Sequence, residues 1–408
     1  MGDRDEGGRL RILKLTKISL LAMGMVLMCA FSWTQGTARS AEHETLRQFA
    51  DKLGFRIGAV MTTRFWDDEP GYRKVMATEF NAGVSIVFMR LTQPEQGRFN
   101  FSQMDRDIAF AREHKLKLFG AALVYRAMQC PEWLVGPMGG PGGGGMPRQQ
   151  DPMMNPMRPG GGRFFPGPMQ GRFPGSQWSA EQLDNILRNH IQTVVRHGGE
   201  DYFAWEVVNE PISNPNQPWE RAFGRDEYIS KAFRYAREAN PNAVLLLNET
   251  FGLGGVNRSK ADEFFDLVRR LKSSNVPIDA VGIEMHLEAQ QLTPAWLEEF
   301  RSFLASARQA GVQAQVTEMD VYQGPPGAFA DPMGNQRVIF HDVVSACLED
   351  SNCKAFFTWG LSDAHTWLTQ KRMNPRPDAK PLLFDANYER KPAYFGVLEA
   401  LTAKTPGA

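Results

Sequence analysis

Two carboxylic acids each follow an apolar stretch of the kind that buried strands use. Glu210 ends the run Trp205-Glu206-Val207-Val208-Asn209-Glu210, and a strand-stopping proline comes next. Glu318 lies far along the chain in a second such stretch, Val316-Thr317-Glu318-Met319-Asp320-Val321. Two acids on separate strand ends suit glycoside hydrolysis, in which one acid protonates the leaving oxygen and the other attacks the anomeric carbon or activates water. Taken singly, either acid could equally cap a helix or lie in a solvated turn.

The elements that must position these acids alternate between strands and helices. The segment Phe99–Asp105 opens a helix by capping, and we expect further helices from Ser179 and at 225–238, 261–272 and 294–310. Besides the strands that end near Glu210 and Glu318, we expect strands at 56–61, 84–89, 116–125, 243–248, 279–286 and 355–359. This order predicts the α/β class and a single barrel domain, whose strand ends build the active-site face.

Five motifs resemble those of glycoside hydrolase family 10, the retaining endo-β-1,4-xylanases. Trp205–Glu210 resembles the family's Trp-Asp-Val-Val-Asn-Glu, and Thr317–Asp320 its Thr-Glu-Leu-Asp. Gly282–His286 resembles its Gly-x-Gln-x-His strand, Trp359–Trp367 its Trp-Gly-x-x-Asp-x-x-Ser-Trp loop, and Pro381–Tyr394 its C-terminal segment. The likeness covers roughly residues 45 to 400 and is weaker before about residue 185.

The resemblance implies a (β/α)8 TIM barrel over residues 45–400 that hydrolyses β-1,4 bonds in xylan or a related plant-type polysaccharide. Glu210 would be the general acid and then the base. Glu318 would be the ionised nucleophile of a covalent glycosyl-enzyme, which gives net retention. No metal and no organic cofactor is implied.

The resemblance also assigns contacts around the two acids. Asn209 would bind the sugar 2-hydroxyl and His286 would orient Glu318. Trp359 and Trp367 would form a platform and a wall for a pyranose ring, although both could instead be core aromatics. The remaining substrate-binding candidates are Tyr125, Asn248 and Glu284.

Two segments depart from the family pattern. The family's Glu-Asn-x-Met-Lys-Trp corresponds roughly to 86–91, and its Gly-His-Thr-Leu-Val-Trp-His to 120–126, so several hydrogen-bonding side chains are missing. Glu284 stands where the family has Gln, which adds a third acid that could act as a neutral hydrogen-bonding group or mark altered substrate choice. Asn248-Glu249 replaces the family's Asn-Asp and could add a contact. The alternatives are therefore the same mechanism on a different or decorated β-glycan, or a catalytically weak carbohydrate-binding relative.

The N-terminus predicts export. Basic residues precede the short apolar run 18–31, and Ala38-Arg39-Ser40 offers a small-x-small cleavage site, so we interpret 1–40 as a signal peptide and expect a secreted or periplasmic protein with no stable membrane span after processing. Cys29 leaves lipoprotein anchoring as an alternative to a discarded thiol. The chain has 46 basic and 46 acidic residues, a balance that favours no nucleic-acid partner. We expect a monomer.

Three cysteines remain after processing. Many family 10 members carry a disulfide at the place of Cys347 and Cys353, so we expect these two to be paired in an oxidising compartment. Cys130 should be a buried free thiol, and His190 a core residue on an apolar helix face. The Gly-, Pro- and Met-rich insertion 136–176 follows the third strand. It could be a flap over the cleft, a soft-metal site formed by its methionines, or an irregular linker.

Overall fold

The computed structural model describes residues 44–62, 65–136, 178–214, 218–369 and 376–405. The chain divides into the segment Met1–Thr45 and the compact unit Leu46–Ala408. The expected signal peptide 1–40 lies outside the described residues, and so does the insertion except for Gly136. Among the described helices, none is both long enough and apolar enough to cross a membrane.

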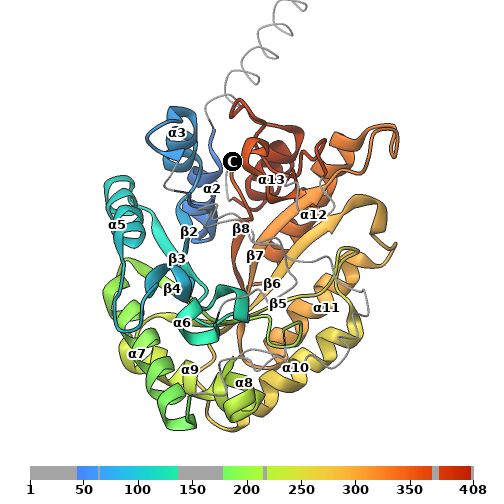
Figure 1. Cartoon of the computed structure of the whole chain (residues 1–408). Helices are drawn as coiled ribbons and strands as arrows, with labels where there is room; N and C mark the ends of the chain where they lie inside the picture. The colour runs from blue at the N-terminus through green and yellow to red at the C-terminus, as the bar shows by residue number, and fades with distance from the viewer. Residues whose placement is uncertain (1–43, 63–64, 137–177, 215–217, 370–375, 406–408) are drawn as a thin grey trace, which may run out of the picture. The chain divides into compact units, whose positions relative to one another are not determined.

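Eight parallel strands close into a barrel in sequence order, and helices surround it (Figure 1). Each strand pairs with its neighbours in the sequence, and the last pairs with the first. The strands are β1 (Arg56–Val60), β2 (Ala82–Ile86), β3 (Lys117–Ala121), β4 (Tyr202–Asn209), β5 (Val244–Thr250), β6 (Ala280–Glu288), β7 (Gln313–Tyr322) and β8 (Cys353–Thr358). The expected (β/α)8 TIM barrel is confirmed.

Helices lie between the strands and at both ends of the described chain. The longest is α7, which begins after Ser179 as expected and has a capping box between Ser179 and Gln182. The helices are α2 (Leu46–Leu53), α3 (Pro70–Glu79), α4 (Met89–Thr92), α5 (Ser102–His114), α6 (Glu132–Val135), α7 (Ala180–Gly198), α8 (Pro218–Phe223), α9 (Arg225–Ala239), α10 (Arg258–Ser273), α11 (Trp296–Gln309), α12 (Pro332–Glu349) and α13 (Pro392–Lys404). Short 3-10 helices are η2 (Ala127–Gln129), η4 (Ala289–Gln291), η5 (Asp363–His365) and η6 (Trp367–Thr369).

Two of the expected strands end more than two residues earlier than predicted. The second ends at Ile86 because the chain turns into α4 at Met89, and the third ends at Ala121 rather than at residue 125. Beyond Ala121 the apolar residues follow β4 instead, since the Leu123 amide donates to the Glu206 carbonyl at 2.9 Å. The residues after Ala121 are buried by packing at the end of the barrel. The apolar run therefore predicted a strand that was too long.

Along β4 and β5 the barrel interior changes from apolar to polar. In β4, Ala204 belongs to an apolar cluster, and Glu206, two residues further on, is buried in the same alternation. Leu246 and Asn248 repeat this pattern in β5. Gly282 of β6 leaves room for the Asn248 side chain, because a Cβ at this position would lie 2.0 Å from Oδ1 of Asn248. The strands thus bring polar side chains together above an apolar layer.

Local contacts tie the ends of elements together. Cys347 at the end of α12 and Cys353 at the start of β8 form a disulfide with their Cα atoms 5.2 Å apart, as expected. Cys130 is free and buried, as predicted. His190 is also buried, and its Nε2 lies 3.0 Å from the Leu123 carbonyl oxygen, which fits a core role.

Candidate active site

Glu210 follows β4 in a backbone conformation that side chains rarely adopt. Its φ is +47°, in the left-handed region, which costs a non-glycine residue on the order of 1 kcal/mol. The surrounding chain holds it there: its amide donates to the Asn248 carbonyl at 2.9 Å, and its Oε2 accepts a hydrogen bond from Nδ2 of Asn214. The other oxygen, Oε1, is buried and has no hydrogen-bond partner among the described residues. Such local strain is typical of functional positions.

The surroundings of Glu210 favour its protonated form. Burial and the charge of Glu249 raise the pKa of the Glu210 carboxyl to about 7, while Arg126 opposes this shift and Glu318 adds to it. A carboxyl with a pKa near neutrality can hold a proton and still release it, which a general acid requires.

Glu318 lies in β7, directly across from Glu284 of β6 in the strand register. Burial raises the pKa of its carboxyl, and the hydrogen bond and charge of His286 act in the opposite direction. Nε2 of His286 lies 3.1 Å from Oε2 of Glu318. Glu318 therefore has a cationic hydrogen-bond donor that Glu210 lacks among the described residues.

His286 is held between carboxylates. Its Nδ1 lies 2.9 Å from Oδ2 of Asp320, while its Nε2 faces Glu318. Burial works against the charged imidazole, but Asp320 and Glu318 outweigh it and raise the pKa of His286 to about 10. Nε1 of Trp367 donates to the same Asp320 oxygen at 2.7 Å, which anchors Asp320 in turn. The imidazole is thus protonated at neutral pH and fixed in orientation.

Asn248 connects several of the predicted site residues. Its Nδ2 lies 3.0 Å from Oδ1 of Asn209, 3.1 Å from Oε1 of Glu284 and 3.5 Å from Oε1 of Glu318. Oγ1 of Thr317 donates to Oδ1 of Asn248 at 2.7 Å, which fixes which end of the amide points into the site. A single buried amide therefore sets the positions of an asparagine and two acids.

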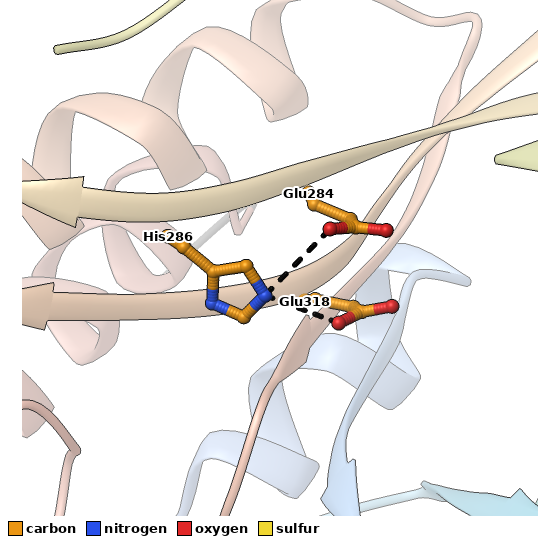
Figure 2. A group of neighbouring side chains, drawn as sticks. All are labelled: Glu284, His286 and Glu318. Carbon is orange, nitrogen blue, oxygen red and sulfur yellow. Dashed lines mark hydrogen bonds and ion pairs between the residues drawn. The ribbon is translucent and has the colours of Figure 1, made fainter. Parts of the chain in front are cut away.

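Glu284 is the third acid of the group (Figure 2), and it is 1 % exposed. Burial and the charges of Glu318 and Glu210 hold the pKa of its carboxyl well above its usual range. Its Oε2 lies 3.8 Å from Nε2 of His286 and has no hydrogen-bond partner among the described residues. The expectation that clustered carboxylates push a pKa upward agrees with this direction.

Tyr125 and Arg126 follow β3 on the same side of the site. The Tyr125 ring is buried, lies 5.8 Å from the ring of Phe88, and has the Arg126 guanidinium 4.9 Å from its centroid. Burial and Glu210 raise the pKa of the Tyr125 hydroxyl well above its usual value. Arg126 lowers the pKa of both Glu210 and Glu318, so it lies within electrostatic reach of both acids.

Trp359 and Trp367 follow β8, and both lie beside His286. Their rings are 6.4 and 5.4 Å from the imidazole, each at a steep angle to it. A buried ion pair of 2.8 Å between Lys391 and Asp363 holds the connection that carries both tryptophans. Both are partly exposed, and Trp359 also packs against the apolar cluster of the barrel interior.

Two buried acids of the site were not among the predicted site residues. Glu206 is 1 % exposed, and burial, Glu318 and Glu210 hold the pKa of its carboxyl well above the usual range. Its position next to Trp205 in a strand was the available signal, because alternate strand residues face opposite sides. Asp320 carried the same signal, since it comes two residues after Glu318.

Glu249 binds the turn that follows Glu210 and the side chain of Lys260. Its Oε2 accepts from the Ile212 amide at 2.8 Å, its Oε1 accepts from Oγ of Ser213 at 2.7 Å, and Nζ of Lys260 lies 3.0 Å from Oε1. The contact that the sequence suggested for this acid is therefore with the turn that follows Glu210. Glu249 fixes that turn and adds negative charge beside the general-acid candidate.

Comparisons with known proteins agree with this geometry. The family model of glycosyl hydrolase family 10 matches residues 45–140 and 166–400. Endo-1,4-beta-xylanase B of Thermotoga neapolitana is 29 % identical over 88 % of this chain and 92 % of its own length. Exoglucanase XynX of Acetivibrio thermocellus is 30 % identical over 85 % of this chain, which spans 28 % of that protein.

The solved structures include xylanase 10B of Thermotoga petrophila in complex with xylobiose, which is 29 % identical with a TM-score of 0.72 and covers 89 % of this chain and 98 % of its own. The family match covers most of the sequence, and the barrel matches as well. This chain is therefore a glycoside hydrolase that belongs to glycosyl hydrolase family 10.

Proposed function

We propose that this enzyme hydrolyses β-1,4 bonds within xylan-type polysaccharides and retains the anomeric configuration, with Glu210 as acid and base and Glu318 as nucleophile. One observation carries the assignment: the two acids occupy different electrostatic surroundings. Glu318 receives a hydrogen bond from the His286 imidazole, while Glu210 lies beside the negative charge of Glu249 and has a pKa of about 7. Two acids whose surroundings differ in this way can divide the roles of proton donor and nucleophile.

The reaction then runs in two steps. Glu210 gives its proton to the glycosidic oxygen while a carboxylate oxygen of Glu318 bonds to the anomeric carbon, and the leaving sugar departs as an alcohol. Glu210, now ionised, takes a proton from water, whose oxygen attacks the same carbon and releases Glu318. This mechanism requires carboxyl groups about 5 to 5.5 Å apart.

The other predicted residues would hold the sugar. Asn209 would bind the 2-hydroxyl, and Asn248 and Glu284 would act with it from the neighbouring strands. His286 would keep Glu318 oriented. Tyr125, Trp359 and Trp367 would present aromatic surfaces to the sugar, because each ring borders the acids or His286.

A second candidate is the same mechanism on a different or decorated β-glycan. It is favoured by the segments 86–91 and 120–126, in which buried apolar side chains such as Val87 and Ala121 offer a sugar no hydrogen bond. A site that lacks such partners selects its sugar by other contacts. The relative named as an exoglucanase shows that matches to this chain are not confined to proteins named as xylanases.

Export is part of the proposal. We infer that residues 1–40 direct secretion or transfer to the periplasm and that the processed protein acts as a monomer on an extracellular polysaccharide. N-terminal sequencing of the mature protein should begin near residue 41, and sedimentation should give the mass of one chain. A mature chain that begins at Cys29 would instead indicate lipid anchoring.

The test compares the protein without residues 1–40 with its Glu210→Gln and Glu318→Gln variants on xylan, mixed-linkage glucan and mannan. We expect cleavage of xylan by the unaltered enzyme and a loss of at least about 100-fold in each variant. NMR of the first products should show the β-anomer. Cleavage of another glycan alone would select the second candidate, and binding without cleavage would identify a carbohydrate-binding relative.

A further inference from the structure

Glu284, His286 and Glu318 form a compact set of metal-ligand atoms. One nitrogen and one oxygen from each acid all lie within 4.8 Å of one another, and the three residues are buried. Figure 2 shows one imidazole nitrogen facing both carboxyl groups from the neighbouring strands. An imidazole with two carboxylates is a common donor set for divalent transition metals.

The separations suit an ion placed between these groups. Nε2 of His286 lies 3.1 Å from Oε2 of Glu318 and 3.8 Å from Oε2 of Glu284. Ligands at zinc bond lengths in a tetrahedral site lie roughly 3.4 Å apart, a value between these two distances. Metal binding would release the protons of His286 and Glu284, and two carboxylates with a neutral imidazole then carry the charge that balances a divalent ion.

The outer contacts orient the set for ligation. Oδ2 of Asp320 lies 2.9 Å from Nδ1 of His286, the carboxylate–histidine arrangement that directs Nε2 toward a metal. Nδ2 of Asn248 donates a hydrogen bond to Oε1 of Glu284, and the other oxygen, Oε2, faces the imidazole. That oxygen is buried without a hydrogen-bond partner among the described residues, and so it is an independent sign of a missing ligand.

We propose that Glu284, His286 and Glu318 bind one divalent transition-metal ion, and that the bound ion inhibits the enzyme. Inhibition follows because an oxygen of Glu318 that ligates a metal cannot attack an anomeric carbon. The inhibition part rests on the proposed function, whereas the binding part does not. The ion competes with substrate and has no place in the hydrolysis itself.

The binding test uses Co2+, whose visible absorption reports ligation directly, and Zn2+ in calorimetry. The protein without residues 1–40 should bind one equivalent of each. Glu284→Gln should weaken binding by at least about tenfold, because loss of a ligand costs no less than loss of an outer contact. Glu206→Gln removes a neighbouring buried acid that lies outside the ligand set, so it should weaken binding much less.

Thermal unfolding of both variants without metal confirms that they fold. Absence of cobalt bands in the unaltered protein, or equal weakening in both variants, would overturn the site. Zn2+ should lower hydrolysis by the unaltered enzyme, and Glu284→Gln should need at least about tenfold more Zn2+ for the same inhibition. Equal sensitivity would overturn the inhibition part. An inactive but metal-binding protein would refute the proposed function and leave the binding site supported.

Discussion

Nδ2 of Asn248 donates a hydrogen bond to Oε1 of Glu284 over 3.1 Å, and this contact favours Oε2 as the oxygen of Glu284 that holds a proton. The carbonyl oxygen of a neutral carboxyl accepts from an amide better than its hydroxyl oxygen does, so this contact favours a proton on Oε2. Glu318 and Glu210 lie close enough to disfavour a further negative charge, and burial disfavours it more. Burial and these charges raise the pKa of Glu284 and so favour its neutral form, which offers a donor where the family has the amide of Gln.

Replacing Glu284 with Gln should stabilise the folded protein more as the pH rises. The unfolded carboxyl has a pKa of about 4.3, whereas the folded one is raised well above this, so the unaltered protein loses stability from about pH 4 upward until the folded pKa is reached. The loss is at most about 1.4 kcal/mol per pH unit, and Gln does not share it. Thermal unfolding at about pH 4 and pH 7 measures the difference. An unchanged gap between the two proteins at both pH values would mean that Glu284 is ionised in the fold.

Glu210 should set the alkaline side of the pH profile. As the proton donor it must be protonated, and its pKa of about 7 means that activity falls as the pH rises through neutrality. Glu210→Gln should lose roughly 100- to 10,000-fold on a polysaccharide. It should lose much less in the first step on an aryl glycoside whose leaving group needs no proton. Stopped-flow release of the aryl group measures that step, and equal losses on both substrates would contradict the role of Glu210.

Much of the arrangement followed from strand pattern. Glu210, His286 and Glu318 each lie at or near the end of an apolar alternation, and the barrel brings such ends together. The start of α7 after Ser179 also followed from local sequence. Features that depend on such local spacing can be predicted from the sequence alone.

Contacts between elements that are distant in the sequence could not be predicted from local residue spacing. The role of Glu249 depends on the turn at Ile212 and on Lys260 of α10, which only the closed barrel brings to it. The end of β3 at Ala121 is set by pairing of the following residues with β4, although the apolar run itself continues. Burial alone therefore could not give the strand boundary.

Asp320 should control the charge of His286. Asp320→Asn keeps the size of the side chain and removes the carboxylate that lies 2.9 Å from Nδ1, so the pKa of His286 should fall below its present value of about 10. His286 then loses its proton at lower pH, and Glu318 loses a charged donor worth about 1.5 kcal/mol or more. We expect a decrease of about tenfold or more in kcat/KM, steeper at alkaline pH. NMR titration of the imidazole measures the first effect, and an unshifted pKa would show that Asp320 does not hold the charge.

Substitutions of Glu249 and Lys260 should shift the alkaline limb of the pH–activity profile in opposite directions. Glu249 raises the pKa of Glu210, so Glu249→Gln should shift the limb to lower pH. Lys260→Met removes the cation 3.0 Å from Glu249 and should shift the limb to higher pH, since the negative charge beside Glu210 is then unbalanced.

Lys260→Met should also lower the free energy of unfolding by about 3 kcal/mol, since it leaves the buried Glu249 without its cation. This value is at the low end for a broken buried ion pair because backbone amides still donate hydrogen bonds to Glu249. pH profiles of kcat/KM and denaturant unfolding of both variants provide the measurements. Shifts of the limb in the same direction would show that the turn's position, rather than charge, governs Glu210.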